Sequence, residues 1–233
     1  MKVLISGGFS GPYEKLLPEF KRTTGIEVTT GSGSSQGTGP QTIGAQLARG
    51  VPTDVVILSR EGLTELMAAR RIAAGTDVDL ARTPIGVAVR VGAAKPEVRT
   101  LEALRQVLLN AAAVAVPSST SGIFLTTEVF PRLGIADRIR VKITPRGTGA
   151  AAMVACGEAD IALLPVSEIA HAPGVELAGV IAEEIQLNQT FAGAVVAGSK
   201  EIEAGKRLIA FLASDRAAAS IRASGMEPLT RPG

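Results

Sequence analysis

The sequence contains few of the residue types on which many enzymes and metal sites depend. Its 233 residues include one cysteine, one histidine, one tyrosine and no tryptophan. A single cysteine can form neither an intramolecular disulfide nor a set of zinc ligands, so we expect Cys156, in the apolar run "AAAMVACG", to pack as a small hydrophobic residue. Metal-ligand spacing is absent, and we expect neither a metal ion nor a cofactor.

A surplus of charge of either sign is also missing. Lysine and arginine number 24 and aspartate and glutamate 22, which leaves a net charge of +2. The basic residues form no run interleaved with aromatic residues, the pattern that is typical of a nucleic-acid-binding surface. We therefore expect that neither nucleic acid nor an anionic membrane surface is a partner.

Long hydrophobic runs are absent as well. No stretch approaches about eighteen consecutive apolar residues, so we expect no membrane insertion. The start, "MKVLISGG", passes directly into a strand-like run without the features of a signal peptide. We expect a cytoplasmic protein if Met1 is the native start, a periplasmic one if a signal peptide has been removed, and a monomer in either case.

What the sequence does contain is an alternation of strand-like and helix-like stretches. Apolar residues make up 46% of the chain, enough to bury a large core. Helix-like patterns cover 12–23, 101–109 and 206–212, and Gly25 is well placed to end the first. The alternation predicts an α/β protein with mostly parallel sheet. The strand-like runs are 2–5, 26–29, 54–58, 85–91, 112–116, 140–143, 161–164 and 192–197.

Loops rich in glycine and hydroxyl residues follow three of these predicted strands. They read "SGGFSG", "GSGSSQGTG" and "PSSTSG" and follow 2–5, 26–29 and 112–116. The carboxyl ends of parallel strands are the edge at which open α/β sheets bind ligands. If the chain folds as two α/β lobes, two such edges would face each other and form a cleft.

The loop "GSGSSQGTGP" at 31–40 combines closely spaced backbone N–H groups with hydroxyl donors ahead of a helix-like stretch. Donors and helix dipole together favour an oxyanion at such a place. A flexible loop with an N-cap explains the composition equally well. The loop is not a nucleotide-binding P-loop, because the required lysine followed by serine or threonine is absent.

The loop "PSSTSG" at 117–122 carries four hydroxyl residues, although one is enough to cap a helix. Ligand contact from Ser119 or Ser121 is therefore as good an interpretation as a structural role. In "PRGTG", 145–149, Arg146 offers a fork of donors to a carboxylate and Thr148 begins the next helix. A solvated loop arginine is the alternative there.

Residues with the chemistry for catalysis are few. His171 has no evident partner, and the serine-rich loops lack an evident base. Glu168 and Asp160 flank the end of the run 161–164, where acids commonly cap or solvate. We predict no catalytic residue, with Glu168 as the candidate base if the protein is an enzyme.

Longer segments of the chain resemble the type II periplasmic substrate-binding proteins, in the branch that includes molybdate-binding proteins and aconitate isomerases. The resemblance covers nearly the whole chain. It is specific to the fold and the branch and much less so to the ligand. Its carriers are "GSSQGTGPQTIGAQLARGVPTDVVILS" (33–59), "IGVAVRVGAAKPEVRTLEAL" (85–104), "SSTSGIFLTTEVFPRLGI" (118–135), "GEADIALLPVSEI" (157–169) and "LIAFLASDRAAASIRASGMEPL" (208–229).

The resemblance implies two α/β lobes with a ligand cleft between them. Lobe one would contain 1–82 and 198–233, lobe two 92–186, and the segments 83–91 and 187–197 would cross between the lobes. The resemblance also implies the ligand-binding residues, to which the loop at 145–149 adds Arg146 and Thr148. The implied residues are Ser6, Gly8, Ser34, Ser35, Ser119, Ser121, Gly122, Pro165 and Ser167.

This resemblance implies one of two functions. The first is a solute-binding protein that closes on a small organic carboxylate or oxyanion and presents it to the membrane subunits of an ABC transporter or to a sensor. The alternative is a cofactor-free isomerase that acts on an unsaturated tricarboxylate such as aconitate, with Glu168 as its base. Because no better base is evident, the sequence favours the binding protein.

Overall fold

The computed structural model describes residues 1–229 of the chain, which forms two α/β units. Unit 1 consists of Met1–Arg82 and Thr190–Gly233, and unit 2 of Thr83–Gln189. The chain therefore enters unit 2 once and leaves it once. Positions 230–233, which the sequence analysis assigns to lobe one, lie outside the described residues.

Unit 1 contains a six-stranded sheet in the order β11-β4-β10-β3-β1-β2. The strand β1 runs parallel to β2 and β3, whereas β10 runs antiparallel to β3 and β11 antiparallel to β4. The strands are β1 (Lys2–Ile5), β2 (Thr29–Ser32), β3 (Val55–Ser59), β4 (Val78–Thr83), β10 (Gln189–Val195) and β11 (Glu227–Pro228), and the helices are α1 (Gly7–Thr24), α2 (Ile43–Ala48), α3 (Arg60–Ala68), α9 (Ile202–Leu212) and α10 (Asp215–Ala223).

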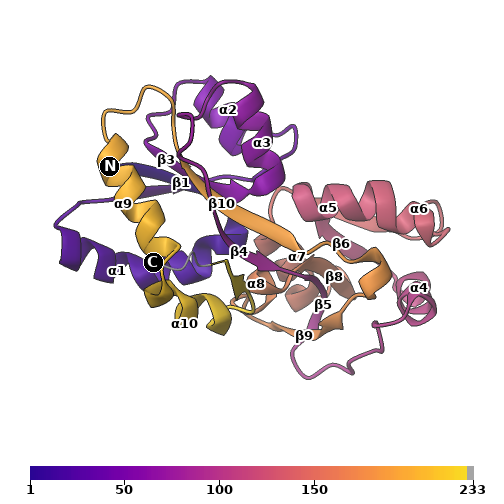
Figure 1. Cartoon of the computed structure of the whole chain (residues 1–233). Coiled ribbons are helices and arrows are strands. Elements are labelled where there is room, and N and C mark those ends of the chain that lie inside the picture. The colour runs from indigo at the N-terminus through magenta and orange to yellow at the C-terminus, as the bar shows by residue number, and fades with distance from the viewer. Residues whose placement is uncertain (230–233) are drawn as a thin grey trace. The chain divides into compact units, whose positions relative to one another are not determined.

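Helices cover both faces of the unit 1 sheet. Successive strand residues point to opposite faces, so Val3 and Val55 pack with α1, α9 and α10, and Leu4 and Val56 pack with α2 and α3. Figure 1 shows α2 and α3 on one side of β1 and β3 and α1 on the other. Both layers leave the carboxyl ends of β1, β2 and β3 at one edge of the sheet.

Unit 2 contains a five-stranded sheet in the order β7-β6-β8-β5-β9. The strand β6 runs parallel to β7 and β8, and β5 runs antiparallel to β8 and β9. The strands are β5 (Ile85–Arg90), β6 (Val114–Pro117), β7 (Val141–Thr144), β8 (Ile161–Pro165) and β9 (Val175–Val180), and the helices are α4 (Leu101–Asn110), α5 (Thr120–Phe124), the π-helix η1 (Leu125–Val129), α6 (Phe130–Arg132), α7 (Gly147–Cys156), α8 (Val166–Ile169) and the 3-10 helix η2 (Glu183–Ile185).

The same alternation builds the two layers of unit 2. One face of the sheet, with Val114 and Leu163, packs against α4 and the segment from α5 to α6. The other face, with Ala115 and Ala162, packs against α7 and α8. Small alanine side chains on this second face allow α7 to lie close to the sheet.

The predicted α/β fold in two units is confirmed, but several elements differ from the expectation. The helix predicted for 12–23 is α1, which begins at Gly7, because the glycines of "SGGFSG" form its first turn instead of a loop. Gly25 ends α1 in the left-handed conformation, φ 69°, as predicted. The sheets are mixed rather than mostly parallel, because β5 and β10, which fall in the predicted crossing segments, run antiparallel to their neighbours.

The expectation for Cys156 is wrong. Cys156 is the last residue of α7 and is exposed, whereas Ala150, Ala151 and Val154 form the buried face of this helix.

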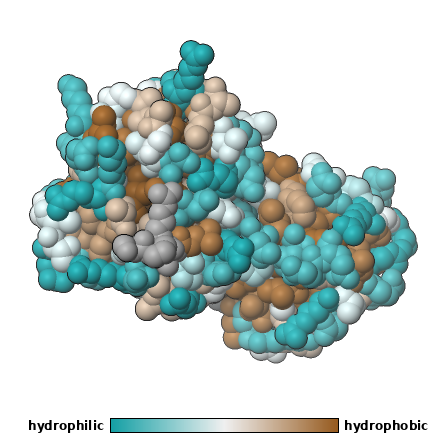
Figure 2. Space-filling view, viewed as in Figure 1, coloured by the Kyte–Doolittle hydropathy of each residue, from teal (hydrophilic) through white to brown (hydrophobic). Residues whose placement is uncertain are grey.

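Hydrophobic residues on the face that Figure 2 shows lie in small groups among hydrophilic ones, as is ordinary for a folded surface. Among residues 1–229, every helix falls short of the length and apolar content needed to cross a membrane.

Candidate functional site

The first turn of α1 is one place where an anion would be stabilised in unit 1. Ser6 is the N-cap of this 18-residue helix, and its backbone N–H donates to Ile57 O at 2.9 Å. Ser6 is 3% exposed, its side chain makes no capping hydrogen bond, and its Oγ has no hydrogen-bond partner in the part of the chain that the structure describes. Among the described residues, a buried hydroxyl therefore lies without a hydrogen-bond partner beside the first-turn N–H groups of a long helix.

Gly8 lies in the same turn and is required by packing. A Cβ atom at this position would lie 2.0 Å from Cζ of Phe191, so any side chain would displace that ring. This close approach keeps the backbone of the first turn of α1 tight against β10.

The loop between β2 and α2 is fixed by the side chain of Gln46. Its Nε2 donates to Ser32 O at 3.0 Å and to Gln41 O at 3.1 Å, which joins the two ends of the loop. Ser34 forms an isolated bridge with Thr42, which is the N-cap of α2 and accepts from Ala45 N–H. The loop is therefore anchored at both ends.

Ser35 is a buried member of this loop with a structural bond. Its Oγ accepts the backbone N–H of Ser59 at 2.9 Å, and Ser59 Oγ in turn accepts the N–H of Gly62 in α3. A Cβ atom on Gly62 would lie 2.4 Å from Ser35 O, so glycine permits this contact. Ser35 joins the loop to the carboxyl end of β3, and its hydroxyl hydrogen remains able to donate.

In unit 2, the residues 117–122 form a tight corner between β6 and α5. The N–H of Ser118 donates to Thr144 O at 2.7 Å, and Ser119 is the N-cap of α5 without a capping side-chain bond. Ser121 is 2% exposed. A Cβ atom on Gly122 would lie 1.6 Å from Pro117 O, so only glycine allows the corner to close.

The loop before α7 places Arg146 at the N-cap of that helix. Thr144 Oγ1 donates to Arg146 O at 2.7 Å, which fixes the backbone of the loop. The Arg146 side chain is half-buried, whereas Thr148 is exposed. Arg146 thus lies at the end of β7, next to the corner at the end of β6.

The end of β8 carries the third group of predicted residues in unit 2. Pro165 ends the strand, and the N–H of Ser167 donates to Thr83 Oγ1 at 3.3 Å. Ser167 is 3% exposed, and its Oγ has no hydrogen-bond partner among residues 1–229. Ser6 in unit 1 and Ser167 in unit 2 are therefore both buried with a side-chain hydroxyl that has no hydrogen-bond partner among the described residues.

Glu168 is the acid with the most perturbed environment in unit 2. Its carboxyl group lies against the first residue of α7, because a Cβ atom on Gly147 would lie 2.0 Å from Glu168 Oε2. Desolvation raises the pKa of Glu168 to about 7, although the positive charge of Arg146 acts in the opposite direction. The side chain is half-buried, yet its carboxyl is poorly solvated.

The fold brings the predicted residues of unit 2 to one sheet edge, because β6, β7 and β8 are adjacent and parallel and each ends in one of these loops. The residues predicted in unit 1 lie directly after β1 and β2, which are also adjacent and parallel. Gln189 was not among the predicted residues; it is buried at the start of β10, and its Oε1 has no hydrogen-bond partner among the described residues. No hydroxyl or glycine cluster marks that position.

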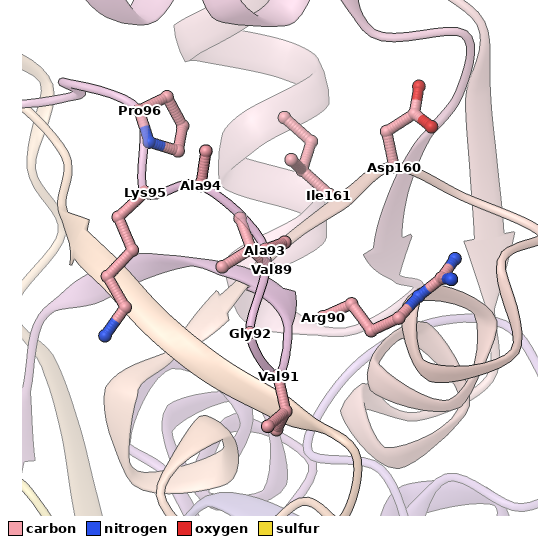
Figure 3. A pocket seen from close by; sticks show the side chains of 10 residues that line it. All are labelled: Val89, Arg90, Val91, Gly92, Ala93, Ala94, Lys95, Pro96, Asp160 and Ile161. Atoms are coloured by element: carbon pink, nitrogen blue, oxygen red, sulfur yellow. The ribbon is translucent and has the colours of Figure 1, made fainter.

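A pocket of about 580 Å³ lies at the other edge of the unit 2 sheet. Its polar side chains Arg90, Lys95 and Asp160 point away from one another (Figure 3). Lys95 pairs with Glu176 at 2.8 Å, and Asp160 accepts the N–H of Ala112. These groups do not converge on a common point, unlike the loops at the carboxyl edge.

Comparison of the sequence with known protein families identifies the family to which the chain belongs. Residues 1–227 match the family described as "Bacterial extracellular solute-binding protein". The chain belongs to this family. The resemblance found in the sequence is thereby confirmed.

Individual relatives of this solute-binding protein differ in what they are named for. It is 35% identical over 98% of its length, and 88% of the other chain, to an aconitate isomerase of Pseudomonas sp.. Its fold is similar to the periplasmic molybdate-binding protein of Azotobacter vinelandii, with a TM-score of 0.76, 20% identity and 100% of both chains covered. The sulfate-binding protein SubI of Mycobacterium tuberculosis gives a TM-score of 0.75 at 20% identity, covering 98% of this chain and 86% of that one.

Both structural relatives confirm the type II periplasmic-binding-protein fold, which consists of two α/β lobes. Among residues 1–229, no group of three His, Cys, Asp or Glu side chains is arranged to hold a metal ion. At the carboxyl ends of the parallel strands, unit 1 offers hydroxyl and backbone N–H groups, and unit 2 offers these together with Arg146 and Glu168.

Proposed function

We propose that this solute-binding protein binds a small anion with carboxylate or oxyanion groups through the loops at the carboxyl ends of its parallel strands. The proposal is carried by one observation, which is the burial of the unpaired hydroxyl groups of Ser6 and Ser167 within the described residues. Both hydroxyls are buried, and neither has a hydrogen-bond partner within residues 1–229. A buried polar group left unpaired costs about 1–3 kcal/mol, so two of them on the predicted ligand loops favour pairing with a ligand.

The charge of the surroundings supports an anion rather than a cation. The first turns of α1 and α7 contain no acidic residue, so the positive ends of both helix dipoles are uncompensated within their own helices. Arg146 adds a positive charge at the start of α7. Hydroxyls and backbone N–H groups donate to an anion without the desolvation penalty of a second buried charge.

The names of the relatives narrow the candidate ligands to two chemical classes. The molybdate- and sulfate-binding relatives are named for tetrahedral oxyanions, and the aconitate isomerase is named for a tricarboxylate. The higher identity to the latter favours an organic polycarboxylate. We further propose that the bound anion is delivered to the membrane subunits of an ABC transporter or to a sensor.

A second candidate function is isomerisation of an unsaturated tricarboxylate such as aconitate. It is favoured by the 35% identical aconitate isomerase and by Glu168, whose pKa of about 7 suits a group that accepts and returns a proton near neutral pH. In this reaction a base removes a proton from the methylene carbon, the double bond moves, and a proton is added at the other end of the allylic system. The reaction consumes no co-reactant.

Calorimetric titration with cis-aconitate, trans-aconitate, sulfate and molybdate tests the binding proposal. We expect one of the carboxylates to bind with the highest affinity. Failure of all four anions to bind would contradict the proposal. Proton NMR of cis-aconitate with the protein in deuterated buffer decides the second candidate: formation of the trans isomer or deuterium uptake above the buffer rate supports catalysis, and binding without either leaves a binding protein.

A further inference from the structure

The carboxyl group of Glu168 occupies a place in unit 2 where an anion would otherwise be favoured. It lies against the backbone of Gly147 in the first turn of α7, and Arg146 is the N-cap of the same helix. Helix N-termini bind anions through their free N–H groups and dipole. The carboxyl group therefore lies at the sheet edge to which the loops of the proposed anion site belong.

The protonation state of Glu168 decides what this carboxyl group can do for a bound anion. An ionised carboxylate only accepts hydrogen bonds and would repel a second anion nearby. A protonated carboxyl group has an O–H that donates to an anionic oxygen. Removing water from the site on ligand binding favours the neutral form further.

We propose that Glu168 binds the anion in its protonated form, as a hydrogen-bond donor, so that the site takes up an anion and a proton together. This inference rests on the proposed anion-binding function and adds a proton-linked step to it. It also gives the ligand a chemical requirement, which is an oxygen that accepts the hydrogen bond of a carboxylic acid.

Few charged or titratable groups lie on the elements packed against Glu168. From α7, the facing charge is Arg146, which favours the ionised form but is outweighed by desolvation. On α8 itself Glu168 is the one charged residue, and His171, just beyond its end, is exposed. The pKa of about 7 for Glu168 means that both of its forms are populated close to neutrality.

The strands beside α8 bring no further charge to the carboxyl group. The strand β8 contains no charged residue. On β5, Arg90 lies at the far end, because Ile85 and not Arg90 is paired with Pro165 next to α8. On β9, Glu176 lies beside Val89, close to the same far end.

The experiment is calorimetric titration of the protein with trans-aconitate near pH 6 and near pH 8, each in two buffers that differ in ionisation enthalpy. For the wild-type protein we expect about tenfold weaker binding near pH 8, and a buffer-dependent enthalpy that reports proton uptake. In the variant Glu168→Gln, whose amide donates at every pH, both effects should disappear. Glu158→Gln, which changes an exposed acid of the same unit, is the matched control and should behave like the wild type.

Each outcome decides between the alternatives. Titration of the ligand's own carboxylates would weaken or strengthen binding equally in all three proteins, so only the difference between the wild type and Glu168→Gln is interpreted. Equal pH dependence and equal proton uptake in those two proteins would overturn the role of Glu168 while leaving anion binding intact. If neither trans-aconitate nor cis-aconitate, sulfate or molybdate binds at either pH, the proposed function itself is overturned.

Discussion

Removing the hydroxyl of Ser6 or of Ser167 separates ligand binding from a structural role. Because neither Oγ has a hydrogen-bond partner among the described residues, Ser6→Ala and Ser167→Ala should leave the free energy of unfolding unchanged or slightly raised. If each hydroxyl donates to the anion, its loss removes a charge-assisted hydrogen bond worth roughly 1.5–3 kcal/mol and weakens binding about ten- to a hundredfold. Urea unfolding and calorimetric titration measure the two quantities.

The control for this pair is Ser35→Ala. Ser35 Oγ accepts the N–H of Ser59 inside the protein, so its removal should lower the free energy of unfolding by about 1 kcal/mol or more. A loss of stability in Ser6→Ala or Ser167→Ala as large as in Ser35→Ala, with unchanged affinity, would return these serines to a purely structural role.

Glu168 should also make stability depend on pH. Its pKa is about 7 in the folded protein against 4.5 for the unperturbed side chain, so between these values the folded state holds a proton that the unfolded state has released. The free energy of unfolding should therefore fall as pH rises from about 4.5 to about 7, by up to about 3 kcal/mol, and stay level above that range. In Glu168→Gln this fall should be absent, and parallel unfolding profiles of the two proteins would contradict the assignment.

The tightness of the corner between β6 and α5 depends on the close approach of two elements, and it can be tested at Gly122. The Cβ atom introduced by Gly122→Ala would lie 1.6 Å from Pro117 O, so the corner must open, at a cost of about 1–3 kcal/mol. Gly39→Ala is the control, since nothing lies within 4 Å of its Cβ position. Unfolding of both variants measures the cost, and equal stabilities would show that the corner is not tight.

At the level of elements, the sequence predicts the features that local pattern determines and misses those that depend on packing. The serine-rich loops and Gly25 are visible because hydroxyls and glycines act locally. The first turn of α1 is not visible in the sequence, because Gly7 and Gly8 are typical of a loop. Only the structure shows the close packing of Gly8 against Phe191. The strands β4 and β9 escape prediction because charged residues interrupt their apolar pattern.

The same limit applies to the site. Glu168 is a weak candidate in the sequence because nothing near it explains a raised pKa, which arises only when α7 packs against α8. Gln46 and Gln189 carry no local signal at all, since their roles depend on a loop backbone and on burial in a strand. Sequence patterns thus predict candidate hydrogen-bond donors, but they do not predict which side chains fix the loop backbone or which carboxyl group has a raised pKa.

For the whole molecule, the prediction that one anion contacts both units remains untested. It leads us to expect that ligand binding makes the protein more compact, because a closed form would be stabilised only by a ligand that reaches both sets of loops. Small-angle scattering with and without ligand measures the compaction. The double variant Ser6→Ala/Ser167→Ala should lose it at a ligand concentration that saturates the wild type, and unchanged scattering of the wild type on binding would contradict a bridging ligand.

The path of the chain through its two units has a consequence for how the protein is made. Unit 2 is one continuous stretch, whereas the sheet of unit 1 needs β10, which inserts between β3 and β4. During synthesis on the ribosome, unit 2 can therefore finish folding before β10 has been made, while the sheet formed by the first 82 residues is still incomplete. A nascent chain that stops at Gln189 should hold a protease-resistant unit 2 behind an N-terminal segment that is still open to digestion.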